Sequence, residues 1–402
     1  MRRLGRIGLF VVAAATLLAP RSALARIKLI TLPVRERVEI QLDNANATLV
    51  EEERIVPLVK GENQVDFSWA NTQIDPNTIV FRVIAPVGER KLDVNVISVS
   101  YPPNEPSLIW SVGSSDSGSA TVRISYLLGN MSKSFNYRAV ASKDETTLTL
   151  AQYIRLQNFA NEEFGSTDLW AGFGREFHKP IGLNETKEML MARFADVPVK
   201  KTYTCDPDEF GWLDQPQQKL RVPMHYVIKN DKNSHLGTAA LPYGKVRIFI
   251  QGNQNPNEDS TAFLGEDWGQ FTPIDDEMKL YLGVAQDIVV RRTIERNNRK
   301  RVAGNLYDQE LIVKYEIENF KDKPVTLDVQ ENVRSLRDQF FGATGRDVQW
   351  ELGNETTFQG GYDKEKSTFE KLIFHADLPA RDKDGKAQKI IQKLHITLKN
   401  EW

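Results

Sequence analysis

The residue types that could do chemistry in this sequence are acids beside an aromatic ring. Glu266, Asp267 and Trp268 are consecutive, and a glycosidase needs two carboxylates across a sugar-sized gap, with an aromatic side chain for stacking. Trp170 and Trp212, both in glycine-bearing stretches, could add stacking surfaces. Adjacent acids on a turn are often only solvated. The sequence therefore predicts contacts with a glycan or a partner here and leaves catalysis as the alternative.

A dense basic run offers a second kind of site. It comprises Arg291, Arg292, Arg296, Arg299, Lys300 and Arg301, interrupted by Glu295. Two interpretations are open: the run binds an anionic polymer, or it pairs across a hairpin with the acids of residues 310–318. We favour the second interpretation, because opposing carboxylates would neutralise the run.

The remaining motifs are incomplete. The five histidines include no H-E-x-x-H pair and no two at a spacing of three or four residues, so the sequence predicts no metal site. Residues 113–118 only superficially resemble the turn of serine hydrolases, and residues 172–174 lack the rest of a phosphate-binding glycine pattern. Cys205 is the only cysteine and stands in no thiol-enzyme signature. We predict no catalytic residue and no cofactor.

Period-two alternation dominates the segments that must position these residues. Apolar side chains recur at every second position in residues 310–318 and again, after a polar turn, in 325–330. This predicts a hairpin in which Tyr315 is buried and Glu316 is exposed. Residues 92–96, 246–250 and 394–398 repeat the alternation. The sequence predicts a mainly β chain of antiparallel β-sandwich domains with one or two short helices.

One segment departs from this alternation. Asn184 is suited to cap a helix, and Leu190 and Phe194 are four residues apart on one helical face. Pro198 would end the run. These signals predict a helix near residues 185–195.

Two proline- and glycine-bearing stretches mark the predicted domain boundaries. The segment 101–106 contains three prolines, and a second break lies near 237–242. The prediction is an N-terminal β domain (26–102), a middle β-sandwich domain (107–238) and a C-terminal β-sandwich domain (239–402).

The N-terminal 25 residues have the composition of a secretory signal peptide. Three arginines precede a short apolar run, and Ala23-Leu24-Ala25 ends it as a cleavage site would. Removing the segment changes 52 basic against 54 acidic residues to 48 against 54, a net charge of −6. We predict an exported chain in the periplasm, the cell envelope or the exterior, with no remaining transmembrane segment and no nucleic-acid partner.

Three motifs occur in order near the C-terminal half. They are a Pro-x-Gly-x-Val-Arg strand entry at 241–248, a glycine–acid turn at 263–267 and a Leu-Gly-x-x-x-Asp segment at 282–288. As a set they resemble the domain-of-unknown-function family 4139, which is related to mucoidy inhibitor A. The resemblance implies a β fold and an envelope location. It implies no reaction, because that family has no established catalytic residues.

Two hypotheses about function follow. The first is a secreted or periplasmic β-sandwich protein that binds an envelope protein or a surface polysaccharide without catalysis. The second is a secreted glycan-binding or glycan-hydrolysing protein that uses Glu266, Asp267 and Trp268. Whether these residues line one concave site distinguishes the two hypotheses.

Overall fold

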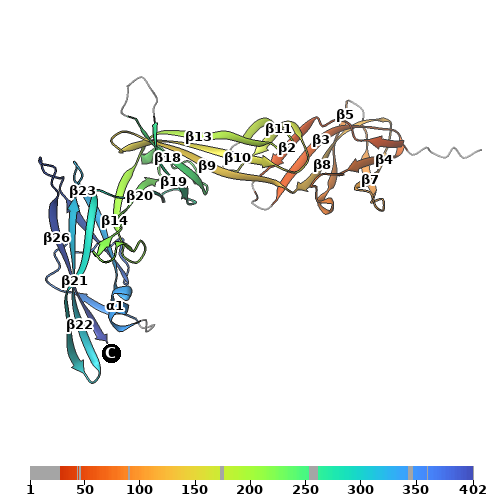
Figure 1. Ribbon diagram of the computed structural model, residues 1–402. Coiled ribbons are helices and arrows are strands. Elements are labelled where there is room, and N and C mark those ends of the chain that lie inside the picture. Colours follow the sequence, from red (N-terminus) through yellow and green to blue (C-terminus); the bar gives the residue numbers. More distant parts are fainter. Residues whose placement is uncertain are drawn as a thin grey trace, which may run out of the picture. The chain divides into compact units, whose positions relative to one another are not determined.

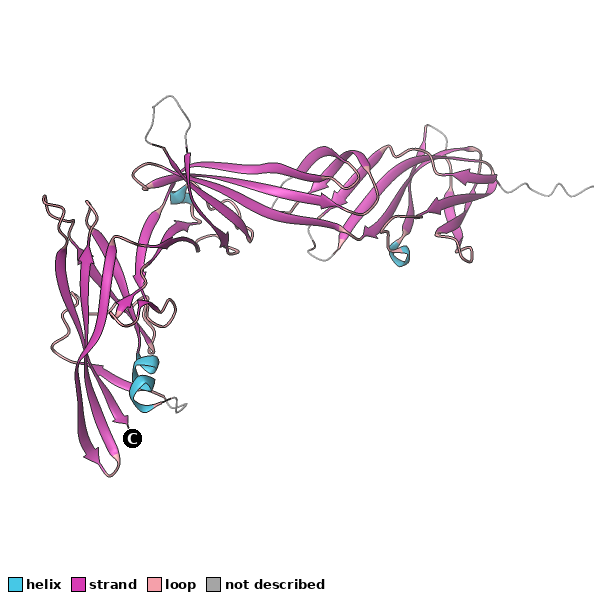
Figure 2. Cartoon of the chain, in the orientation of Figure 1, coloured by secondary structure: helices cyan, strands magenta, loops and turns pink. Residues whose placement is uncertain are grey.

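The fold comes from a computed structural model, which describes residues 28–42, 44, 47–88, 91–172, 176–252, 261–342, 347–359 and 361–401. The predicted signal peptide (1–25) lies outside the described residues. Strands account for most of the chain, as Figure 2 shows, and the mainly β, sandwich-like prediction is confirmed. None of the helices in the described part of the chain is long and apolar enough to cross a membrane.

The chain divides into two compact units, and each is described by itself. Unit 1 comprises residues 1–131, 158–170 and 176–184. Its smaller sheet has the order β1 (Lys28–Thr31), β4 (Gly61–Ser68), β7 (Ser107–Ser114) and β6 (Val94–Ser100). Its larger sheet has the order β12 (Glu176–Ile181), β11 (Phe164–Trp170), β2 (Arg37–Gln41), β3 (Thr48–Leu58), β8 (Gly118–Leu128) and β5 (Val80–Val87). A single-turn 3₁₀ helix, η1 (Pro76–Thr78), contacts β8.

Unit 2 comprises residues 132–157, 171–175 and 185–402, and its described residues form three sheets. The first, shown in Figure 1 with its long strands side by side, has the order β13 (Thr186–Pro198), β10 (Thr147–Asn158), β9 (Met131–Ala141), β18 (Gly244–Gln251) and β19 (Thr261–Gly269). The second has the order β20 (Glu277–Val284), β17 (Pro223–Lys229), β14 (Lys200–Cys205), β23 (Val325–Asn332) and β25 (Lys371–Leu378). The third has the order β15 (Trp212–Asp214), β16 (Lys219–Leu220), β21 (Ile288–Ala303), β22 (Leu306–Asn319), β26 (Gln388–Glu401) and β24 (Gln349–Leu352). The short 3₁₀ helix η2 (Lys232–Ser234) follows β17.

The main core of unit 2 lies between its second and third sheets. Alternate residues of β22, among them Val313 and Tyr315, face alternate residues of β23 and β25 such as Val329 and Phe374. Both layers bury one face of each strand, as the two-residue period requires. Cys205 is completely buried in the same core, and this burial raises the pKa of its thiol.

In the described part of the chain, the α-helix α1 (Val333–Phe341) interrupts the strands. The side chain of Asn332 caps it by accepting a hydrogen bond from the backbone N–H of Ser335, and Gly342 ends it with a positive φ of 73°. The guanidinium of Arg337 is buried and donates to the carboxylate of Glu401 on β26 at 2.8 and 2.9 Å. The helix is therefore anchored to the third sheet by a charged pair as well as by Leu336.

The helix predicted near residues 185–195 is wrong. These residues belong to β13, which pairs antiparallel with β10. Met189 and Met191 are buried two residues apart, whereas Leu190 points outward and is half exposed. Pairing along a long neighbouring strand outweighs the modest helix preference of this segment, because propensity differences are below about 1 kcal/mol per residue.

The hairpin predicted between residues 310–318 and 325–330 is also wrong. Residues 310–318 lie in β22, which pairs with β21 and β26, whereas 325–330 lie in β23, which pairs with β14 and β25. The polar turn between them therefore carries the chain from one sheet to the other. The burial of Tyr315 was predicted correctly. Glu316, which was predicted to be exposed, is half-buried.

The segment 101–106, which the sequence marks as a domain boundary, is the connection between β6 and β7. These two strands pair with one another in a single sheet of unit 1. Prolines in this position remove backbone donors at the end of two strands, which suits a turn as well as a linker.

Candidate functional site

The site that gathers the most sequence-predicted residues is the outer face of β18 and β19. Val246 and Ile248 are buried under the first sheet of unit 2, so the side chains between them point outward. The antiparallel register sets Lys245 opposite Trp268 and Arg247 opposite Glu266. We call the outward side chains of β9, β18 and β19 the outer face.

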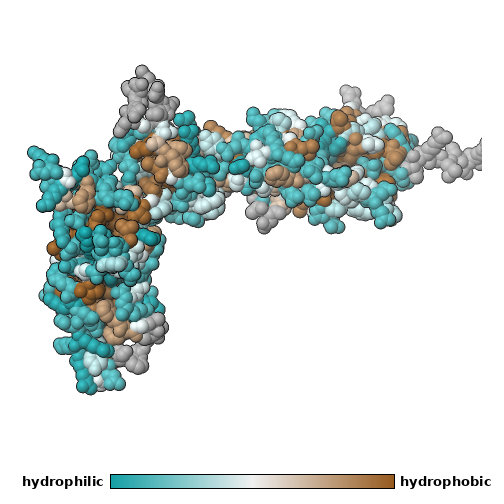
Figure 3. All heavy atoms as spheres, in the orientation of Figure 1, coloured by the Kyte–Doolittle hydropathy of each residue, from teal (hydrophilic) through white to brown (hydrophobic). Residues whose placement is uncertain are grey.

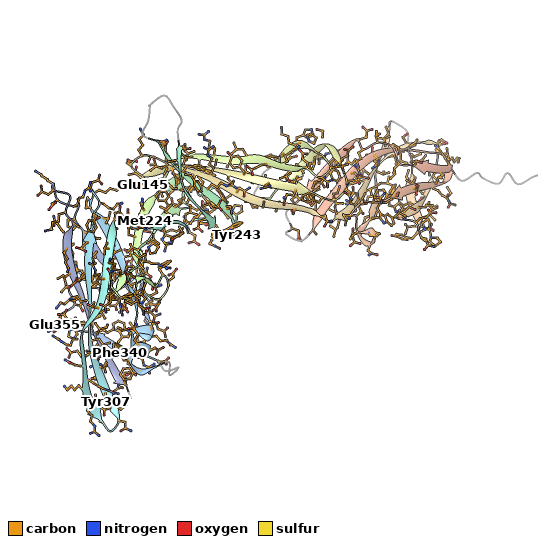
Figure 4. All side chains as sticks on the ribbon, in the orientation of Figure 1. Glu145, Met224, Tyr243, Tyr307, Phe340 and Glu355 are labelled. Atoms are coloured by element: carbon orange, nitrogen blue, oxygen red, sulfur yellow. The ribbon has the colours of Figure 1, made fainter. Side chains whose placement is uncertain are left out.

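An exposed aromatic stack lies at one end of this face. The rings of Tyr243 and Trp268 are nearly parallel, at 3°, with centroids 5.1 Å apart. Tyr243 is 51% exposed and Trp268 is 47% exposed, and Figure 4 labels Tyr243 at the start of β18. The ammonium of Lys245 lies 5.2 Å from the Trp268 ring centroid, within cation–π range. Large aromatic rings left in water beside a cation are typical of ligand-contacting surfaces.

A second aromatic pair lies at the other end of the outer face. Phe249 and Phe263 meet edge to face with centroids 5.5 Å apart, and Phe263 is exposed. The guanidinium of Arg138 on β9 lies 5.0 Å from the Phe249 ring centroid. Lys245 lies opposite Trp268, and Phe249 follows it four positions later in β18, so the two aromatic pairs are roughly 13 Å apart along the strand. The basic side chains of Lys245 and Arg247 lie on β18 between the two pairs.

The carboxylates of Glu266 and Asp267 point to opposite faces of β19, because they are neighbours in a strand. Glu266 accepts a bond from Lys245 at 2.9 Å, and this bond lowers the pKa of its carboxyl group. Asp267 accepts bonds from the backbone N–H of Trp268 at 2.8 Å and of Tyr281 at 2.7 Å. The two acids are engaged separately and do not flank a common gap, so this geometry does not support a glycosidase pair.

The other two tryptophans lie elsewhere. Trp170 ends β11 in unit 1 and is 37% exposed, whereas Trp212 forms β15 and packs against the core between the second and third sheets of unit 2. Trp212 is thus partly buried against this core. Sequence analysis missed Tyr243 and Phe249. The signal for them was the alternation of β18, but only the register with β19 shows which rings they meet.

The six basic residues of β21 do not share one surface. Arg292 points into the core, where the carboxylate of Glu331 accepts bonds from it at 2.7 and 3.0 Å. Arg291 forms an ion pair with Glu318 at 2.9 Å, and the Arg296 guanidinium lies 3.1 Å from Glu310. The cross-strand pairing with acids of β22 therefore holds for Arg291 and Arg296.

The remaining members of the run lie nearer the end of the β21–β22 hairpin. The Arg299 guanidinium lies over the ring of Tyr307 at 4.1 Å and that of Phe341 at 5.3 Å. Lys300 is opposite Asp308 in the register, and Arg301 donates to the backbone carbonyl of Gly304 at 2.9 Å. Figure 3 shows hydrophilic residues over much of the visible surface of unit 2. Charge on this surface is distributed among local partners.

A cluster of three ligating side chains lies beside β21. Atoms of Glu310, Glu355 and His395 that could bind a metal are all within 4.8 Å of one another. However, the guanidinium of Arg296 lies 2.6 Å from Glu355 and 3.1 Å from Glu310, and it lowers the pKa of both carboxyl groups. The backbone N–H of Glu355 donates to His395 Nδ1 at 3.3 Å. A cation would have to displace the guanidinium, so the geometry indicates an ion-pair cluster.

His375 on β25 provides a pH-dependent contact that the sequence did not reveal. Its ring nitrogens lie 2.8 Å from Asp328 and 3.1 Å from Asp363. Burial lowers the pKa of His375, but the two carboxylates more than offset this and raise it above its usual value. A histidine of this kind stabilises the fold below its unfolded pKa of about 6.5, and the contribution disappears as the pH rises through its folded pKa.

We therefore expect His375→Gln to lower the melting temperature at about pH 5.5 and to have little effect at about pH 9, where the wild-type ring is neutral. Thermal unfolding of both proteins at the two pH values measures this. Asp363→Asn should reduce the same pH difference. An equal loss for His375→Gln at both pH values would contradict the assignment.

The sequence matches no protein-family model and no curated protein.

Proposed function

We propose that this chain is an exported, non-catalytic binding protein that holds an anionic surface polysaccharide on the outer face of β18 and β19. The exposed stack of Tyr243 on Trp268 is the single observation that carries the proposal. Sugar rings present apolar C–H faces that lie against aromatic side chains, and an exposed stacked pair offers such a surface without reorganisation.

Charge on the same face supports an anionic polymer. The outward side chains of β9, β18 and β19 include three cations, Arg138, Lys245 and Arg247, against the single carboxylate of Glu266. The ion pair with Glu266 leaves positive charge in excess between the two aromatic pairs. A cationic strip flanked by aromatic rings favours an extended chain that carries repeated negative groups.

The proposal includes no catalytic role because of the way the carboxylates of Glu266 and Asp267 are held. Glu266 and Asp267 are each held by other groups and point apart, so neither is placed to work with the other on one bond. The predicted export of the chain gives it access to polymers of the cell envelope, and an envelope protein that presents acidic side chains is the second candidate partner. The site chemistry is the same in both cases.

The proposal is tested by replacing the stacked tryptophan. Isothermal titration of the full chain with oligogalacturonate, a uronic acid oligomer, should show that Trp268→Ala weakens binding about fivefold, because one aromatic contact contributes about 1 kcal/mol. Trp170→Ala in unit 1 is the matched control and should bind as the wild type does. Equal affinities for wild type and Trp268→Ala would overturn the assignment of this face.

A further inference from the structure

We propose that unit 2 has a second binding site, a lysine-lined pocket that takes a small molecule carrying two or more carboxylate or phosphate groups. The pocket has a volume of about 520 Å³. This lies within the range of about 300–1,000 Å³ that is usual for small-molecule sites. It shares no lining residue with the outer face of β9, β18 and β19, because the pocket is lined by the β9–β10 turn, where Figure 4 labels Glu145, and by β14 and β23 of the second sheet.

The charged side chains of this pocket that could still bind a ligand are mainly lysines. Lys200, Lys201, Lys323 and Lys366 all line it. Lys201 is held by Glu145 at 2.6 Å, and Lys323 lies 3.7 Å from the same carboxylate. Lys200 and Lys366 are exposed, and neither has an ion-pair partner within the part of the chain that the structure describes.

The carboxylates that line the pocket are already engaged. Glu145 accepts bonds from Lys201 and from the hydroxyl of Tyr226, each at 2.6 Å. Asp328 is held by His375 at 2.8 Å, and Asp144 accepts bonds from the hydroxyls of Ser142 and Thr146. A bound anion would therefore meet the ammonium groups of Lys200 and Lys366, because the acids that line the pocket are engaged by other groups.

A buried hydroxyl in the pocket wall gives an independent reason to expect a ligand. The Oγ1 atom of Thr202 is buried and has no hydrogen-bond partner in the described structure, although Thr202 lines the pocket. Buried polar groups are nearly always satisfied by protein, water or a ligand. Lys200 lies two residues before Thr202, on the same face of β14. A carboxylate or phosphate oxygen held by Lys200 would supply an acceptor for this hydroxyl.

The ligand class follows from these groups. Ammonium groups act as point charges that bind compact anions, and no aromatic face is needed to hold them. The distribution of lysines over β14, the β22–β23 connection and the segment before β25 spreads the charge around the pocket wall. More than one anionic group on the same small molecule is needed to reach all of them.

The experiment is isothermal titration of the full chain with citrate, which carries only carboxylates, and with inorganic pyrophosphate. The double variant Lys200→Gln/Lys366→Gln should lose binding on the order of tenfold or more for whichever probe binds, because two charge-assisted contacts disappear. The matched control Lys383→Gln/Lys386→Gln removes the same charge from the exposed connection between β25 and β26 and should bind as the wild type does. Binding of citrate alone assigns a carboxylate ligand, and binding of pyrophosphate alone assigns a phosphate ligand.

A second variant separates charge from geometry. Thr202→Val preserves shape and charge and should weaken binding several-fold, since the hydroxyl contact is lost. No heat with either probe, or equal losses in the pocket variant and its charge-matched control, would overturn the proposal. Oligogalacturonate binding by Lys200→Gln/Lys366→Gln should remain that of the wild type, so failure here is distinguishable from failure of the outer-face assignment.

Discussion

Replacing Glu331 with Gln should destabilise unit 2 by about 3–5 kcal/mol, the usual cost of leaving a buried charge without its partner. Glu331 is 1% exposed, and it accepts bonds from the guanidinium of Arg292 and from the hydroxyl of Tyr315. Burial alone would lower the pKa of Arg292, but Glu331 more than offsets this and raises it. A guanidinium has a pKa so far above neutral that Arg292 stays charged even when Glu331 is replaced by a neutral side chain. Hydrogen exchange of amides in β21 and β22 measures the loss within unit 2.

The control for this substitution is Glu318→Gln. Glu318 pairs with Arg291 at 2.9 Å, but both side chains are partly in water, so the change should cost less than about 1 kcal/mol. The double variant Arg292→Met/Glu331→Leu removes both charges and should be far less destabilised than Glu331→Gln. Similar losses for Glu331→Gln and Glu318→Gln would contradict the role assigned to the buried pair.

Replacing Gly244 with Ala should cost about 1–3 kcal/mol through overpacking, because there is no room for a methyl group at this position. A Cβ there would overlap the backbone carbonyl of Phe135, the residue that Gly244 faces in the parallel pair of β18 and β9. Backbone cannot rotate away as a side chain can, so β18 must shift. Since Tyr243 and Lys245 flank this glycine, binding to the outer face should weaken together with stability.

Gly265→Ala is the matched control for that change. Gly265 lies in the neighbouring strand β19, and a Cβ there would meet only the carbonyl oxygen of Leu282 at 3.9 Å, an ordinary contact. Thermal unfolding and oligogalacturonate titration of both variants provide the comparison. If Gly244→Ala matches Gly265→Ala in both measurements, β18 and β9 do not pack as described.

The local alternation of apolar and polar residues predicted well which face of a strand is buried. Tyr315 is buried as the two-residue period requires, and Arg291 and Arg296 meet acids of β22 as the charge pattern suggested. Both results depend on the strand period and on neighbours joined by one short turn. Information of this kind is contained within a few tens of residues.

Pairing between distant strands could not be predicted in this way. Residues 325–330 have the alternation of a hairpin partner for β22, yet β23 pairs in parallel with β14, more than a hundred residues earlier in the chain. The segment 186–198 has helix-compatible residues and becomes a strand because β10 provides a partner. Alternation fixes which face is buried, but it does not identify the neighbour.

The same limit explains what was missed at the site. Trp268 was recognised from its acidic neighbours, but Tyr243 was not, because only the register of β18 with β19 brings the two rings together. The pocket combines the β9–β10 turn with β14 and β23 from the second sheet. Such combinations depend on the order of strands in the sheets, which single-strand patterns do not contain.

The central claim is that the outer face of β18 and β19 binds an anionic polysaccharide, and the most direct test is a comparison of two ligands. Isothermal titration of the full chain with oligogalacturonate and with a neutral cello-oligosaccharide of equal length should show binding of the charged oligomer. That affinity should fall as salt is added, because salt screens attraction to Arg138, Lys245 and Arg247. Equal affinity for the neutral oligomer, or no binding of the charged one at low salt, would contradict the account.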